Sequence, residues 1–412
     1  MRRQHSPAPC HNRAMTGKLD PRAARWLLAF LLLLMLYGSL QPFQLRPVDF
    51  SSPLDLVRRL RWDASTPGEL FVNVLVYVPF GAVLAFALPP ALGAAARIAL
   101  ATLAGFVLSS CVEVAQLFVV TRVASLADVA TNTCGACLGC GAGLLARGLA
   151  QRLAASGSLR VTHEPAAAAL ALVWLATFLP PWRMRFNPVG WPAEWARLLE
   201  SGWPAASAIA LNALGWLTAA LLLRAITRPQ QVWPALLVLA AATLTVQFTW
   251  FARFAGAEQL LGALLALAAW PLLQRFPDRP LTAALAGAIA LTLTWRALSP
   301  FEFGAHPRAL RLVPFQELIG RGSTGFVLPL LFAKLFRDGS LVWLLTRLGV
   351  GALAAGVITA LLLLAIGVGQ LWVRPVHHLF TSTDPLLALA AGLVMALLRN
   401  PAAGTPRQHV GR

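Results

Sequence analysis

Charged residues are scarce in this chain, and their scarcity sets the class of protein. Only 12% of the 412 residues are charged, whereas 58% are hydrophobic and the mean hydropathy is +0.68. Soluble domains have roughly 25% charged and 45–50% apolar residues, so a soluble globular fold is excluded. The apolar runs are continuous and do not alternate with period two, which excludes a transmembrane β-barrel. The sequence therefore predicts an all-α membrane protein.

Cysteine is rare as well. The five cysteines are Cys10, Cys111, Cys134, Cys137 and Cys140, and they form no disulfide framework. The close spacing of the last three is compatible with a metal site, but no histidine or further cysteine lies nearby in the sequence. A helix rich in small residues also favours cysteine as a small apolar packing residue. We prefer this interpretation, and the sequence predicts neither a metal nor a cofactor.

The common catalytic motifs are missing. There is no Gly-x-Ser-x-Gly elbow, no His-Glu-x-x-His and no Walker loop. The net charge is +18, yet basic residues occur singly and form no nucleic-acid-binding stripe or motif. His377 and His378 adjoin Arg374 and Asp384, and we interpret them as part of a solvated loop rather than a metal centre. The sequence therefore argues against a nucleic-acid partner and leans away from an enzyme.

Long apolar runs are what the sequence does contain. A transmembrane helix needs about 20 apolar residues, and such runs recur between short segments with arginine and proline. The predicted helices are 26–40, 69–88, 98–120, 125–147, 165–180, 205–225, 232–252, 256–273, 281–298, 324–336, 341–372 and 385–398. The predicted helix 341–372 is long enough to tilt strongly in the membrane or to contain a break. We expect a polytopic bundle of about twelve helices, in which the run Trp26–Leu40 is a retained first helix.

The runs group into three tandem units of four helices. The predicted units are 26–150 (first unit), 165–275 (second unit) and 281–399 (third unit), with a basic tail at 1–25 and another tail at 400–412. Placing both tails in the cytoplasm gives the cytoplasmic side a large excess of basic residues, as the positive-inside rule requires. The second and third units are expected to be degenerate copies of the first.

Short motifs support this repetition. The motif "LQPFQLRP" at Leu40–Pro47 is echoed by "LPPWRMRF" at Leu179–Phe186 and "LSPFEFGA" at Leu298–Ala305. The motif "QLFVVTR" at Gln116–Arg122 is echoed by "QFTWFAR" at Gln247–Arg253 and "QLWVRPV" at Gln370–Val376. Chance similarity between Leu- and Ala-rich segments is the alternative.

Polar residues gather in the first unit within an apolar neighbourhood. Their cost at mid-bilayer is ~2.5–3.5 kcal/mol per charge, so they should face a bundle interior or a water-filled pocket. The candidate ligand-binding residues are Asn73, Glu113, Gln116, Arg122, Asp128 and Asn132. Glu113 and Gln116 are three residues apart and project from nearly the same helix face, and Arg122 is expected to turn back toward the carboxylates.

The helix after Asp128 combines this polar end with small residues. Asp128, Asn132, Gly135 and Gly139 follow the spacing i, i+4, i+7 and i+11, which places them on one stripe. Gly135, Gly139 and Gly143 form a ladder of small residues that allows another backbone to approach closely. Pro79 is expected to bend the helix that begins near Asn73.

These residues resemble a known family. Asn73 with "YVPFG" (Tyr77–Gly81), followed by Glu113, Gln116, Arg122, Asp128, Asn132 and "GACLG" (Gly135–Gly139), is similar to the VanZ-like membrane proteins over roughly residues 26–150. The founding member of that family is linked to low-level resistance to the glycopeptide teicoplanin. The resemblance implies a bacterial inner-membrane protein with a role in the cell envelope, and it supplies no established reaction.

Three interpretations of the polar set remain open. It is a lock between helices, a site for an amphiphilic envelope molecule, or a catalytic site in which Glu113 or Asp128 acts as general base. In the binding interpretation, an outward-facing polar pocket holds a lipid-linked envelope precursor or a glycopeptide. Arg122 contacts phosphate or carboxylate, Asp128 and Asn132 contact sugar or peptide groups, and membrane lipids surround the bundle. A secondary transporter and a structural component are the alternatives.

The later units are expected to have lost this set. The residues at the position of Glu113 are Leu244 and Gly367, and those at the position of Asp128 are Gln259 and Asp384. We therefore predict that the first unit holds the working site and that the others mainly build the bundle.

Overall fold

The protein is an all-helical bundle in a computed structural model. The residues that the structure describes are 21–41, 43–49, 51–62, 67–89, 91–155, 164–178, 196, 204–250, 256–307, 314–315, 324–373 and 381–398. The helices are α1 Pro21–Leu40, α2 Pro53–Arg58, α3 Pro67–Ala87, α4 Ala94–Gln116, α5 Leu126–Ala155, α6 Pro165–Ala176, α8 Ala206–Ile226, α9 Pro229–Trp250, α10 Ala257–Leu273, α11 Asp278–Leu298, α13 Thr324–Arg347, α14 Ala352–Gln370 and α15 Thr383–Leu398. Within these ranges twelve helices have at least 12 residues, and α2 has six. The predicted fold of about twelve helices is confirmed.

Several helices are suited to cross a membrane. Six are long and apolar enough to do so, namely α3, α4, α5, α8, α11 and α14, and α1, α6, α10 and α15 contain shorter apolar helices. Large apolar side chains also lie on the outside of the bundle, such as Leu145 and Leu291 with exposed fractions of 73% and 70%. Lipid chains would cover such side chains. The chain is therefore a multi-pass membrane protein.

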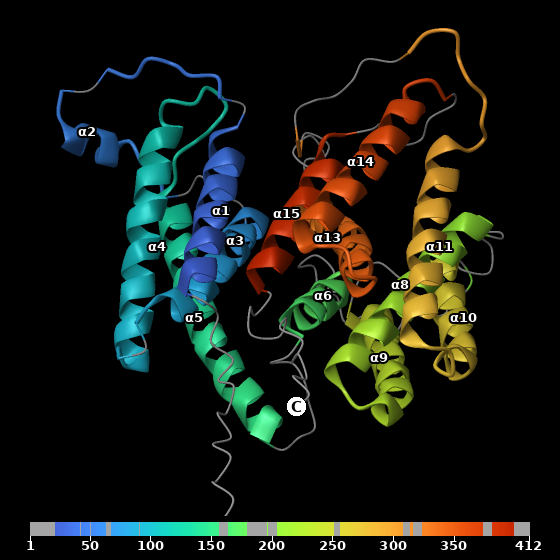
Figure 1. Ribbon diagram of the computed structural model, residues 1–412. Helices are drawn as coiled ribbons and strands as arrows, with labels where there is room; N and C mark the ends of the chain where they lie inside the picture. The colour runs from blue at the N-terminus through green and yellow to red at the C-terminus, as the bar shows by residue number, and fades with distance from the viewer. Residues whose placement is uncertain are drawn as a thin grey trace, which may run out of the picture.

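The helices form two bodies, α1 to α5 and α6 to α15, which meet where α1 contacts α15 and α3 contacts α13. Figure 1 shows α1, α3, α4 and α5 together on one side, α8 to α11 on the other, and α13 to α15 between them, with α15 beside α1. Helices α1, α4, α11 and α14 end at the top of Figure 1, which we call the upper end, and helices α3 and α10 end at the lower end. The first unit has a core of its own around Tyr77 and Phe80, whereas the second and third units share one core.

Helices α3 and α5 pack through glycines that leave no room for a side chain. A Cβ atom added to Gly139 would lie 2.0 Å from the carbonyl oxygen of Val78, and one added to Gly135 would lie 2.3 Å from that of Val74. Gly81 of α3 faces the carbonyl of Ala136 in the same way. The predicted ladder of small residues is thus confirmed. Helix α3 continues through Pro79 without interruption.

The helix boundaries in the third unit differ from the prediction. The expected break at 337–340 does not occur, because α13 runs without interruption from Thr324 to Arg347. The connection lies instead at 348–351, where Gly349 has φ +102°, a backbone conformation that glycine adopts without steric cost. The predicted helix 341–372 is therefore the end of α13 followed by α14, and the break that its length allowed lies between them. This correction places Lys334, Arg337 and Asp338 inside one long helix.

Two upper-end connections have the same backbone arrangement. Phe43 and Phe301 both have positive φ, 61° and 65°. Two residues later, Leu45 forms an antiparallel bridge with Val119, and Phe303 forms one with Val373. These are the paired motifs of the first and third units. Repetition of whole units stays a prediction, since the motif copy at Leu179–Phe186 lies outside the described residues.

Candidate functional site

The first part of the site is Glu113, which links α4 to the start of α5. Its side chain is only 2% exposed, and Oε2 accepts a hydrogen bond of 2.8 Å from the backbone N–H of Ser125. Ser125 directly precedes α5, and its Oγ accepts a hydrogen bond of 3.3 Å from the N–H of Asp128. This is an N-cap, in which a serine oxygen satisfies an N–H group of the first helical turn. Glu113 therefore holds the residue that starts α5.

The second part lies one turn deeper and joins three helices. Asn132 of α5 is 5% exposed and donates from Nδ2 to Oγ of Ser109 on α4 over 2.9 Å. The buried Tyr77 of α3 also hydrogen-bonds Ser109 and lies close enough to Glu113 to feel its charge. No donor among the described residues reaches Oδ1 of Asn132. An unpaired buried oxygen costs about 1–3 kcal/mol, so this atom can accept a hydrogen bond from a bound molecule.

The third part of the predicted set attaches to the end of α1. Nε2 of Gln116 donates to the carbonyl of Ser39 over 3.0 Å. Arg122 donates from Nη2 to the carbonyl of Gly38 over 2.8 Å and from Nε to that of Gln41 over 3.2 Å. The last carbonyls of a helix have no partner inside it, and a nearby cation satisfies them. Arg122 therefore holds α1 and does not turn its donors to the carboxylates as expected.

Arg122 stays charged in this setting. Burial lowers the pKa of its guanidinium, while Glu113 and Glu69 act in the opposite direction, and an arginine starts from a pKa too high for deprotonation in proteins. Two of its five N–H groups are used on α1, so further N–H groups remain for an anion at the upper end.

We expect the variant Arg122→Gln to loosen the end of α1. Charge-assisted hydrogen bonds contribute about 1.5–3 kcal/mol when buried, and this partly exposed pair of bonds should contribute roughly 1–2 kcal/mol. The measurement is amide hydrogen exchange of the peptide that covers residues 33–41, which should become faster. Arg58→Gln is the control, because Arg58 is 72% exposed and its one ion-pair partner among the described residues is Asp55, at 3.8 Å. Equal protection in both variants would contradict this role of Arg122.

The predicted residues thus share the upper end of the first unit but do not form one contact set. Glu113, Asp128 and Asn132 meet through serines, Gln116 and Arg122 contact α1, and Asn73 lies half-buried one turn before Tyr77 on α3. The prediction missed Tyr77, Ser109 and Ser125. The spacing of the two serines could have identified them. Ser109 precedes Glu113 by four residues and so lies on the same helix face, and Ser125-x-x-Asp128 is a capping pattern.

A second group of charges lies in the third unit, where Asp338 is buried and Lys334, Arg337 and Asp384 are partly buried. Lys334 lies 2.7 Å from the carboxylate of Asp384, and Arg337 lies 3.2 Å from the same oxygen. Arg337 also forms two hydrogen bonds of 2.7 and 3.1 Å with Asp338, whose side chain is fully buried. This group joins α13 to α15. The prediction assigned Arg337 and Asp338 to a connection and therefore missed it.

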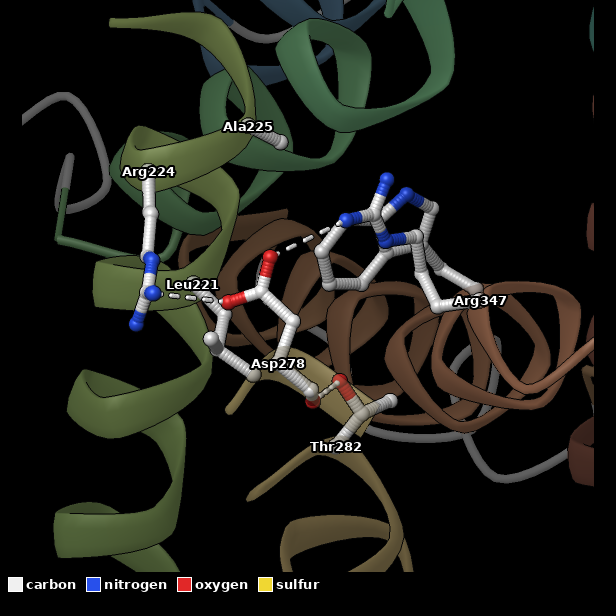
Figure 2. A pocket seen from close by; sticks show the side chains of 7 residues that line it. Leu221, Arg224, Ala225, Asp278, Thr282 and Arg347 are labelled. Atoms are coloured by element: carbon white, nitrogen blue, oxygen red, sulfur yellow. Dashed lines mark hydrogen bonds and ion pairs between the residues drawn. The ribbon is translucent and has the colours of Figure 1, made fainter. Parts of the chain in front are cut away.

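A pocket lies at the lower end, between the second and third units. Figure 2 shows Arg224 and Arg347 on opposite sides of Asp278, with Leu221, Ala225 and Thr282 also in its wall. Arg224 lies 2.9 Å from one carboxylate oxygen and Arg347 lies 3.7 Å from the other. The sequence analysis named none of these residues.

The described residues contain no group of three or more His, Cys, Asp or Glu side chains suited to hold a metal ion. Cys111, Cys134, Cys137 and Cys140 are free thiols. His377 and His378 lie outside the described residues.

Comparison with known proteins bears on the first unit. Residues 25–147 match the family model described as VanZ/LLP1, which is almost the range of the predicted first unit. No curated protein and no solved structure matches the chain. The first unit is therefore a VanZ-like domain, and it contains all six candidate residues.

Proposed function

We propose that the VanZ-like first unit binds the polar head of a lipid-linked or cell-wall-related molecule at the outer face of a bacterial inner membrane. The upper end is the outer end in this proposal, and both chain termini are cytoplasmic. The connection after α10 contains Arg275 and no acidic residue, the connection after α3 contains no charged residue, and an excess of Lys and Arg favours the cytoplasmic side.

One observation carries this proposal, namely the unpaired Oδ1 of the buried Asn132. It lies in the same interior network as Tyr77 and Ser109 and below the carboxylate of Glu113. If these residues served only to hold the helices together, their buried polar atoms should all be hydrogen-bonded to one another, because buried polar groups are normally paired. A hydroxyl or amide N–H of a sugar or peptide would supply the missing donor, and Arg122 would attract an attached phosphate. The apolar outer surface of the bundle suits a lipid tail.

Mass spectrometry of co-purifying molecules tests the proposal. The protein is purified in native lipid, and Asn132→Ala and Glu113→Gln are compared with the wild type. Loss of a hydrogen bond to a ligand at this site should reduce retention roughly tenfold, since 1.4 kcal/mol changes an equilibrium tenfold.

Asn212→Ala is the matched control. Asn212 lies on α8, and its amide donates to the carbonyl of Ala208 on the same helix over 2.9 Å. Its replacement should leave the profile of bound molecules unchanged. Identical profiles in the wild type and all three variants would rule out the first unit as the binding site.

A secondary transporter is the second candidate function, and the charges between α13 and α15 favour it. Ionisable residues inside a membrane are costly and often mark an ion or substrate path. Flux into vesicles that depends on a proton gradient would support this function. Binding of an envelope molecule without such flux would support the binding protein instead.

A further inference from the structure

The lower-end pocket places two arginines where the second and third units meet. Arg224 lies near the end of α8, Arg347 ends α13, and Asp278 begins α11. The carboxylate of Asp278 sits between the two guanidinium groups, as Figure 2 shows, and an ion pair of 3.1 Å joins Arg347 to Glu164 just before α6. An anionic group therefore fits between these arginines, because one of the protein's own groups already occupies that place.

Both arginines keep donors for a further anion. Among the described residues, Arg224 uses one N–H on the carbonyl of Gln274 and another on Asp278, whereas Arg347 donates to Glu164 and forms a longer ion pair with Asp278. Each guanidinium has five N–H groups. The two side chains are 22% and 35% exposed, so an external group can reach them. Asp278 is half exposed and has room to turn toward water.

The surroundings add charge and an apolar wall. Three exposed arginines lie close in sequence to the residues of the pocket, Arg228 before α9, Arg275 before α11 and Arg279 in the first turn of α11. With Arg224 and Arg347 they give five positive charges against the two negative charges of Asp278 and Glu164, a net charge of 5 − 2 = +3. Leu221, Ala225 and Trp343 supply the apolar side of the pocket. Basic pockets between helix ends attract anionic lipid head groups.

We propose that this pocket binds the phosphate of an anionic phospholipid in the leaflet at the lower end. Arg224 and Arg347 hold the phosphate oxygens, and the lipid displaces the carboxylate of Asp278 from one or both arginines. Because the pocket joins α8 to α11 and α13, the bound lipid fastens the second unit to the third. The site is separate from the first unit and does not depend on the function proposed for it.

Lipid titration of the purified protein tests this proposal, because the arginine variants should weaken lipid binding and the Asp278 variant should strengthen it. The affinity for phosphatidylglycerol in nanodiscs is measured by native mass spectrometry, with phosphatidylcholine nanodiscs as the neutral reference. Arg224→Gln and Arg347→Gln should each weaken binding of phosphatidylglycerol at least fivefold. Asp278→Asn should strengthen it at least twofold, because the competing carboxylate is gone. Arg152→Gln, an exposed arginine on α5 outside the pocket, should change nothing.

If Arg224, Asp278 and Arg347 form only a structural ion pair between the helices, the variants should give a different result. In that case all three pocket variants lower the thermal transition temperature, and none changes the affinity for phosphatidylglycerol, which would overturn the proposal. Inorganic phosphate alone is the third arm. If it binds as tightly as the lipid and depends on the same arginines, the site takes free phosphate and the lipid assignment is wrong.

Discussion

Replacing Gly139 with alanine should disrupt the first unit, although alanine is normally the better helix former. The added Cβ would lie 2.0 Å from the carbonyl oxygen of Val78 and 2.8 Å from its carbonyl carbon, so two backbones must move apart. Overpacking of a close contact typically costs 1–3 kcal/mol and sometimes more. Here the obstacle is backbone that cannot rotate away, and we expect a loss of about 3 kcal/mol.

Gly141→Ala is the control for this experiment. Gly141 lies on the same helix two residues later, and a Cβ atom there would meet nothing within 4 Å. Alanine is favoured over glycine in a helix by up to about 1 kcal/mol, so this variant should be neutral or slightly more stable. Thermal unfolding in detergent, followed by size-exclusion chromatography, measures both variants. Equal transition temperatures would show that α3 and α5 do not approach as closely as described.

The contact between α3 and α5 could be predicted because small residues repeat at helical spacing. Gly135, Gly139 and Gly143 fall on one stripe whatever the rest of the fold does. The gathering of polar residues at one end of the first unit follows in the same way from the alternation of helix direction. These inferences need only helix period and membrane thickness.

The partners of the polar residues could not be predicted. Glu113 and Gln116 share a helix face, yet Glu113 bonds Ser125 and Gln116 bonds the end of α1, because the end of α4 contacts two neighbours. The carbonyls that Arg122 reaches belong to residues 81 and 84 positions away. The hydrogen-bond partner of each side chain depends on tertiary packing, which the local sequence does not determine.

The missed continuation of α13 has a similar cause. The segment from Lys334 to Ser340 combines charge with glycine, which is typical of a connection. In the folded protein the charges pair with Asp384 of α15, and Gly339 packs so closely that a Cβ atom would lie 2.8 Å from a methyl group of Leu170. These tertiary contacts thus stabilise a helix that the local sequence disfavours.

The group between α13 and α15 leads to the other large expected effect. Asp384→Asn removes the carboxylate that Lys334 and Arg337 share, and the group then carries two positive charges and one negative charge. Removing one partner of a buried ion pair costs about 3–5 kcal/mol, because the other charge stays buried without compensation. Because Lys334 and Asp384 are 13% and 24% exposed, water screens part of this effect. We expect a loss of about 2 kcal/mol, measured as a lower transition temperature in detergent.

The double variant Lys334→Met with Asp384→Leu separates stability from function. It removes one charge of each sign, leaves Arg337 paired with Asp338, and should recover most of the stability, since apolar replacement of a buried pair is often neutral or favourable. A double-mutant cycle should give a coupling energy of about 1–3 kcal/mol, whereas additive losses would show that the two side chains act independently. If the protein carries a substrate or proton through this region, the double variant is stable but inactive. If the charges only join α13 to α15, activity returns together with stability.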